Sequence, residues 1–96
     1  MRVLIKANMD TDRGNEAIRT GKMPEIVQGA LERIKPEAAY FGPLDGCRSM
    51  LLVVDIPDSS QIVPTLDPLF SDLGARLEVT PIMNLDDLKK GLSQLQ

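Results

Sequence analysis

The first nine residues, MRVLIKANM, alternate between two kinds of side chain. The odd-numbered positions are all apolar: Met1, Val3, Ile5, Ala7 and Met9. The even-numbered positions are mixed: Arg2, Leu4, Lys6 and Asn8. Successive side chains of a β-strand point to opposite faces of a sheet, so this pattern predicts a strand with one apolar and one mixed face. We therefore expect the odd-numbered residues to pack beneath helices, and Leu4, Lys6 and Asn8 to line a more polar surface.

The composition is typical of one soluble domain. Ninety-six residues, 43% apolar and 26% charged, suffice for a single core, so we expect one domain over residues 1–96. The formal net charge of −3 disfavours a nucleic-acid partner, which needs a basic surface. One cysteine cannot form an intramolecular disulfide, and no apolar run is long enough to cross a membrane. Because the chain also starts without a signal-peptide pattern, we expect a cytoplasmic protein.

Histidine is absent from the chain. Its absence removes the commonest metal ligand and every Ser–His or Cys–His catalytic pair. With a single cysteine as well, we expect no metal site and no cofactor. Any chemistry must come from carboxylates, lysine, arginine, the lone tyrosine, amides or hydroxyls.

Apolar residues at helical spacing predict three helices. Residues 23–34 carry one stripe, with Pro24 in the first turn and Pro36 beyond the end. Residues 62–73 repeat the stripe up to Gly74, and Pro68 is expected to kink this helix or to begin a second segment. Asn84 is a suitable cap for a last helix, whose leucines form a narrow seam: Leu85, Leu88, Leu92 and Leu95. A shorter helical piece is predicted at residues 15–20, after a polar turn at residues 10–15.

Three further strands are predicted. Residues 38–41 and 48–56 flank Asp45 and Gly46, a pair typical of a β-hairpin turn. Residues 50–54 contain no polar side chain, which predicts a central strand buried on both faces. Residues 75–83 alternate again, and because proline cannot donate a ladder hydrogen bond, we expect this strand to lie at an edge of the sheet or to end at Pro81.

The predicted order is strand, helix, strand, strand, helix, strand, followed by one more helix. This order predicts an α+β protein with a ferredoxin-like βαββαβ sandwich, in which both helices cover one face of the sheet, and an additional C-terminal helix. The other face would expose an apolar central strand in a monomer. We therefore expect a homodimer in which a second copy covers that face.

Four stretches carry a likeness to known proteins: GNEAIRTGKMPEIVQ (residues 14–28), KPEAAYF (35–41), DGCRS (45–49) and LEVTPIMNLDDLKKGL (77–92). They resemble small bacterial proteins of the dimeric α/β-barrel superfamily that have no assigned activity. In that superfamily two ferredoxin-like sheets pack face to face, and ligands bind between sheet and helices or inside the barrel. The resemblance implies a dimeric α/β barrel, and because members include cofactor-independent monooxygenases and muconolactone isomerases, it also admits an enzymatic role.

Other proteins with this strand order differ at diagnostic positions. RNA-recognition domains stack bases on aromatic side chains of the third strand, where this chain has SMLLVV at residues 49–54. Metallochaperones need a Cys-x-x-Cys loop after the first strand, where this chain has DTDR at residues 10–13. Acylphosphatases place an arginine in a glycine-rich first loop, of which only Arg13 and Gly14 are present. Amino-acid-binding regulatory domains stay an alternative, because backbone groups hold most of their ligand contacts.

Six residues form the predicted site. The fourth strand of this topology pairs with the first, which places four polar residues on the face without helices: Lys6, Asn8, Glu78 and Thr80. Inside a closed barrel, Lys6 and Glu78 would be a buried pair that orients a ligand, with Glu78 as catalytic proton acceptor. The alternative is an exposed cross-strand ion pair. On the hairpin strands, Arg48 would clamp a carboxylate and Tyr40 would donate a hydrogen bond, unless both are packing residues.

These expectations lead to a homodimer that binds a small, mostly apolar organic ligand in the barrel. Two alternatives stay open. One is a cofactor-independent monooxygenase or isomerase of the same architecture, in which Glu78 accepts a proton. The other is a structural or regulatory dimer without a cavity.

Overall fold

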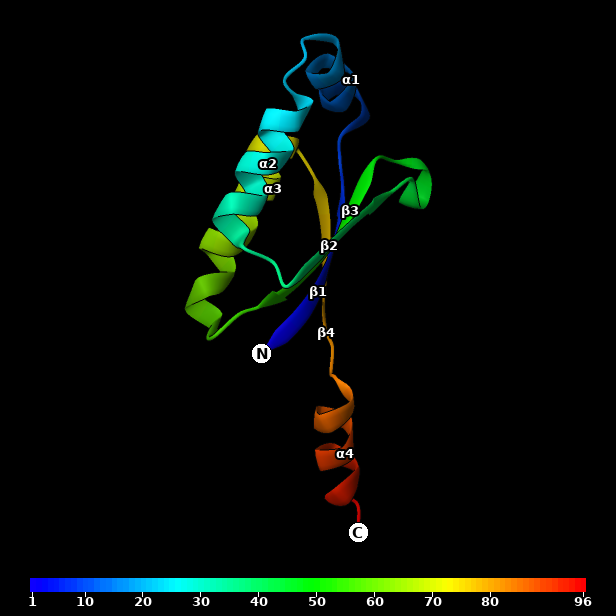
Figure 1. Cartoon of the computed structure of the whole chain (residues 1–96), viewed down its shortest axis with the longest axis vertical. Helices are drawn as coiled ribbons and strands as arrows, with labels where there is room; N and C mark the ends of the chain where they lie inside the picture. Colours follow the sequence, from blue (N-terminus) through cyan, green and yellow to red (C-terminus); the bar gives the residue numbers. More distant parts are fainter.

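The computed structural model describes all residues from 1 to 96 and contains four strands and four helices (Figure 1). The strands are β1 (Arg2–Asn8), β2 (Ala38–Gly42), β3 (Ser49–Asp55) and β4 (Arg76–Pro81). The helices are α1 (Thr11–Arg19), α2 (Met23–Ile34), α3 (Ile62–Leu73) and α4 (Leu85–Ser93). Short 3-10 turns lie at Leu44–Gly46 and Ser59–Gln61. The chain is an α+β protein, as the sequence predicts.

The four strands form one antiparallel sheet in the order β2-β3-β1-β4. β1 is central, and its Ile5 lies opposite Leu52 of β3 on one side and Val79 of β4 on the other. β4 is an edge strand, which confirms the prediction made from Pro81. This strand order is compatible with the ferredoxin-like βαββαβ fold.

The core lies between the sheet and the helices α2 and α3, which run side by side on one side of it (Figure 1). We call this side of the sheet the helix face; on β1 it carries Val3, Ile5 and Ala7, each at most 2% exposed. The same cluster includes residues of β3, α2 and α3: Met50, Leu52, Val54, Ala30, Ile34, Leu69 and Leu73. The prediction that the odd-numbered residues of β1 pack beneath helices is confirmed.

The opposite side of the sheet, the open face, has no helix over it. Its side chains come from all four strands: Leu4, Lys6, Asn8, Tyr40, Leu51, Val53, Glu78 and Thr80. β3 is a central strand, as residues 50–54 predict, and its Met50, Leu52 and Val54 are buried on the helix face, while burial on the open face stays a prediction. Leu51 and Val53 are only half-buried, because the single chain supplies no second layer on the open face.

Two helices differ from their predicted extents. α1 begins at Thr11 rather than at residue 15, because the Asp10 carboxylate accepts a hydrogen bond from the backbone N–H of Arg13 at 2.9 Å and caps the first turn. The predicted polar turn at residues 10–15 is therefore mostly helix. α3 continues as one helix with Pro68 inside it, so no second segment begins there.

The last helix projects from the end of β4, beyond the sheet (Figure 1). Asn84 caps it as predicted: its side chain accepts from the N–H of Asp87 at 2.8 Å, and the Asp87 carboxylate accepts from the N–H of Asn84 at 3.3 Å. Every residue of α4 is exposed, and the molecule measures 57 × 27 × 17 Å. No helix of the structure combines the length and apolar character that a membrane span requires.

Candidate functional site

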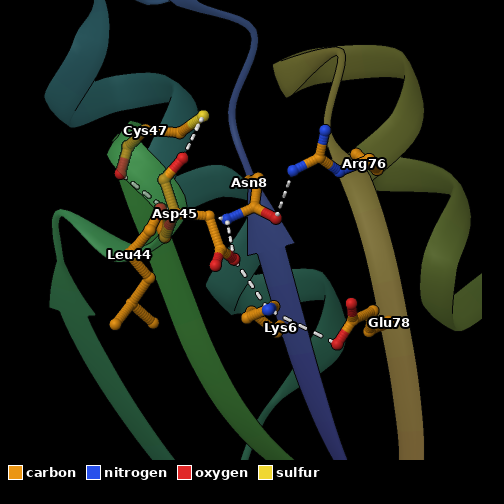
Figure 2. A network of polar contacts seen from close by, with 8 residues as sticks. Lys6, Asn8, Leu44, Asp45, Cys47, Arg76 and Glu78 are labelled. Carbon is orange, nitrogen blue, oxygen red and sulfur yellow. Dashed lines mark hydrogen bonds and ion pairs between the residues drawn. The ribbon is translucent and has the colours of Figure 1, made fainter.

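A polar network occupies one end of the open face (Figure 2). The Lys6 ammonium lies at its centre, 2.7 Å from Oδ2 of Asp45 and 3.4 Å from Oε2 of Glu78. The sheet brings Lys6 and Glu78 together, since they are directly opposite in the β1–β4 register. The prediction of a cross-strand pair is confirmed. Its Glu78 partner is 69% exposed, so in the single chain the pair is a surface contact.

The turn between β2 and β3 delivers Asp45 to this network. Asp45 and Gly46 both have positive φ, 57° and 73°, a conformation that glycine adopts freely and aspartate tolerates better than most residues. The resulting turn folds the Asp45 carboxylate over the end of β1. Sequence reasoning treated Asp45 only as a turn residue, although a carboxylate in a tight turn next to a strand carrying lysine is a usable signal.

Lys6 and Asp45 each favour the charged form of the other. The hydrogen bond and charge of Lys6 hold the pKa of Asp45 below its usual value. The hydrogen bond to Asp45, with a smaller contribution from Glu78, raises the pKa of Lys6. At neutral pH the ammonium therefore stays charged, and it is already neutralised by carboxylates of the same chain.

Asn8 is buried and fully engaged, with 5% of its surface exposed. Its amide nitrogen donates to Oγ of Ser49 at 2.8 Å and to the carbonyl of Leu44 at 3.3 Å. Its amide oxygen accepts from the guanidinium of Arg76 at 3.4 Å. Each polar atom of Asn8 thus has a partner within the chain, and the residue ties the β2–β3 turn to the central strand. No free polar atom is left to orient a ligand.

Tyr40 and Thr80 lie on opposite edges of the open face. Tyr40 belongs to β2 and is 66% exposed, whereas Thr80 belongs to β4 and is also exposed. Neither side chain makes a hydrogen bond or takes part in the ion pairs around Lys6. The structure therefore does not bring these two predicted ligand-binding residues together with the others in the single chain.

Arg48 lies on the other side of the sheet, at the rim of an apolar cleft. The residue precedes β3 with the same parity as Met50, which the register places on the helix face. The cleft has a volume of about 450 Å³, and residues of β1, α1, α2, β2, β3 and α3 line it: Ala7, Met9, Ile18, Met23, Val27, Phe41, Gly42, Pro43, Arg48, Ser49, Met50 and Leu73. Glu78, on the open face, cannot reach a molecule bound here.

Gly14 allows the Arg48 side chain to lie against α1. A Cβ atom at this position would come within 3.0 Å of Sδ of Met9 and 3.1 Å of Nη1 of Arg48. Both distances are too short for an ordinary contact, so a larger residue would push Arg48 or Met9 out of place. Sequence reasoning did not find this cleft. The usable signals were a glycine inside a helix and apolar residues off the helical stripe, such as Ile18.

A second cleft of about 390 Å³ shares Met9, Met23 and Leu73 with the first. Its outer wall is charged, with Asp12, Arg13, Glu16 and Lys22. The structure contains no group of three or more metal-ligating side chains.

Comparison with known proteins adds no assignment. Neither the family models nor the curated proteins give a match to this chain.

Proposed function

We propose that this chain forms a homodimer that binds a small, mostly apolar organic molecule. The observation that supports ligand binding is the apolar cleft lined by Met9, Met23, Val27 and Arg48. Its volume of about 450 Å³ falls within the usual range for small-molecule sites, roughly 300–1,000 Å³. Sites of this kind are lined mainly by apolar side chains with a few placed polar groups, and this cleft has that composition.

The proposed ligand position differs from the interior of a barrel. Within the dimeric α/β-barrel superfamily, which the chain resembles in sequence, ligands lie either inside the barrel or between sheet and helices. The cleft between the sheet and α1 and α2 supports the second position. The charges of Lys6 and Glu78 on the open face are already paired with each other and with Asp45, so they offer less to an incoming molecule.

A second copy is the proposed cover for the open face. Leu4, Leu51 and Val53 form a half-buried apolar strip across the middle of that face, with exposed Tyr40 beside it. A dimer in which each copy covers the other's strip closes on itself through one two-fold axis. Such packing would complete a barrel of the kind that the sequence resemblance implies.

α4 supports the same proposal. Leu85, Leu88, Leu92 and Leu95 point their side chains into solvent, where they are 41–80% exposed. A nine-residue helix with no packed face is only marginally stable in water. The chain's own sheet does not cover it, so we propose that the leucine seam packs on the second copy.

The cleft is tested with 2-naphthalenemethanol, an uncharged fluorescent probe, and the full-length chain, which has no tryptophan to interfere. Val27→Phe places extra atoms in the cleft, and we expect it to weaken probe binding about ten-fold or more. Val63→Phe makes the same change at an exposed position of α3 outside the cleft and should leave binding unchanged. Absence of saturable binding to the wild type, or equal effects of both variants, would overturn the proposed site.

The dimer is tested by light scattering of the full chain at micromolar concentration. We expect a dimer for the wild type and a shift towards monomer for the double variant Leu88→Ser, Leu92→Ser, with the dissociation constant raised on the order of a hundred-fold. Lys90→Ser, on the polar side of α4, is the control and should leave the dimer intact. A wild-type monomer would contradict the proposed assembly and leave the cleft as a separate question.

A further inference from the structure

Arg48 is the one arginine of the chain without a partner. Three of the other five form ion pairs: Arg2 with Glu37, Arg19 with Glu16, and Arg33 with Asp72. Arg13 donates to the backbone carbonyl of Ser71, and Arg76 donates to the amide oxygen of Asn8. The Arg48 guanidinium forms no ion pair and donates no hydrogen bond within the chain. It is thus a free cation, and it is the only charged side chain among the twelve residues that line the apolar cleft.

The surroundings of Arg48 favour an anionic ligand. No aspartate or glutamate lines the cleft, so no carboxylate of the chain competes for the guanidinium there. Arg48 itself is exposed, so an incoming anion reaches its guanidinium from solvent while apolar side chains, among them Met9, line the cleft beside it. The other polar side chain of the cleft, the Ser49 hydroxyl, is already hydrogen bonded to the carbonyls of Leu44 and Cys47.

We infer that the cleft takes a small apolar carboxylic acid, whose carboxylate is held by Arg48 while its hydrocarbon or aromatic body lies against Met9, Met23 and Val27. This inference rests on the proposed function, because it assigns the class of molecule that the same cleft binds. A guanidinium matches a carboxylate with two parallel N–H···O hydrogen bonds. One arginine balances one negative charge, so a monoanion fits better than a phosphate monoester, which carries close to two.

The fold places Arg48 at the rim of the cleft. Gly14 leaves the space through which the Arg48 side chain passes along α1, since a Cβ there would lie 3.1 Å from Nη1. The backbone on both sides is fixed as well, because the N–H of Met9 donates to the carbonyl of Arg48 at 2.8 Å. Arg48 therefore lies at the rim of the cleft with its guanidinium exposed, facing neither the network around Lys6 nor a carboxylate of its own chain.

Three probes with the same aromatic body test the inference: 2-naphthoate, 2-naphthalenemethanol and 2-naphthyl phosphate, titrated by fluorescence at neutral pH. We expect the wild type to bind naphthoate more tightly than the alcohol and the phosphate. Arg48→Gln should lower naphthoate affinity about ten- to hundred-fold, and far more than it lowers affinity for the alcohol. Arg48→Lys keeps the charge but loses the planar guanidinium, so its naphthoate affinity should lie between those of the wild type and Arg48→Gln.

Arg19→Gln is the matched control, because Arg19 lies on α1 but is exposed and paired with Glu16 outside the cleft. It should bind all three probes as the wild type does. Equal binding of acid and alcohol, or no change in Arg48→Gln, would overturn the carboxylic-acid inference while the apolar site stands. Tighter binding of the phosphate would also overturn it. Failure of all three probes to bind would instead overturn the proposed function.

Discussion

On the helix face of the sheet, Ile5 and Leu52 are fully buried beneath α2 and α3, whereas on the open face their strand neighbours Leu4 and Leu51 are only partly buried. The same two strands build both faces. The single chain therefore packs helices on one face of the sheet only. Sheets with one solvated face usually carry polar side chains there, and the apolar strip on the open face is the observation behind the proposed dimer.

The polar side chains of the two faces differ in whether they have partners within the chain. On the open face, Lys6 and Asn8 have their partners within the chain, namely Asp45 and Ser49. On the helix face, Arg48 has none. A cluster of charged and polar residues is thus a poorer indicator of a binding site here than one unpaired cation beside apolar side chains, because paired groups must first give up their partners.

The largest expected effect compares the two faces of β1 directly. Ile5→Ala removes a fully buried side chain from the core and should lower the free energy of unfolding by about 2–5 kcal/mol. Leu4→Ala, one residue away, should cost less, about 1–2 kcal/mol, because the Leu4 side chain is only partly buried in the single chain and the space it leaves opens to solvent. Urea denaturation measures both variants.

Repeating the denaturation at two protein concentrations sharpens this comparison. If a second copy covers the open face, the effect of Leu4→Ala should grow with protein concentration, because dimer formation stabilises the folded chain by mass action. The effect of Ile5→Ala should change much less. Equal and concentration-independent losses in both variants would show that the two faces do not differ in the way described.

A smaller effect is expected at the buried amide of the open face. Asn8→Ala removes the donor to the Ser49 hydroxyl oxygen and the acceptor of the Arg76 guanidinium, and it should cost about 1–3 kcal/mol of unfolding free energy. A double-mutant cycle with Ser49→Ala isolates the Asn8–Ser49 hydrogen bond. We expect positive coupling in stability and no change in the affinity for 2-naphthalenemethanol. A loss of probe affinity would return Asn8 to the binding site.

Local sequence signals predicted much of this architecture. The alternation in residues 1–9 gave the correct burial for Val3, Ile5 and Ala7, because that pattern depends only on the pleat of a strand. The capping box of Asn84 and the edge position of β4 were also predicted, since each follows from one or two residues. The dimeric barrel stays a prediction.

Features set by contacts distant in the sequence were harder to predict. Arg48 was predicted to share one site with Lys6 and Glu78, yet it lies on the other side of the sheet, because the pairing of Ala7 with Met50 fixes its side and no local pattern specifies that pairing. Asn8 was expected to orient a ligand, yet it is engaged by a turn 36 residues further along the chain. The start of α1 was missed because Gly14 disfavours a helix locally, whereas the Asp10 cap starts the helix at Thr11.

The smallest expected effect concerns the Lys6–Asp45 pair, whose contribution should depend on pH. Lys6 lowers the pKa of Asp45 in the folded chain, so the pair's stabilisation is present above the unfolded pKa, about 3.9, and is lost as the pH falls through the folded pKa. Since the pKa of Lys6 is raised, the stabilisation that Lys6 contributes is present below its unfolded pKa of about 10.4 and is lost as the pH rises through the folded pKa.

Asp45→Asn should therefore be less stable than the wild type between these limits, and the difference in urea denaturation should shrink in acid. Asp67→Asn, which alters an exposed carboxylate without an ion pair, is the control and should show no such convergence. A difference in stability that stays constant throughout the acid range would mean that Asp45 stabilises the chain through its turn geometry rather than through Lys6. The ion pair between Lys6 and Asp45 would then contribute less to stability than its distance of 2.7 Å implies.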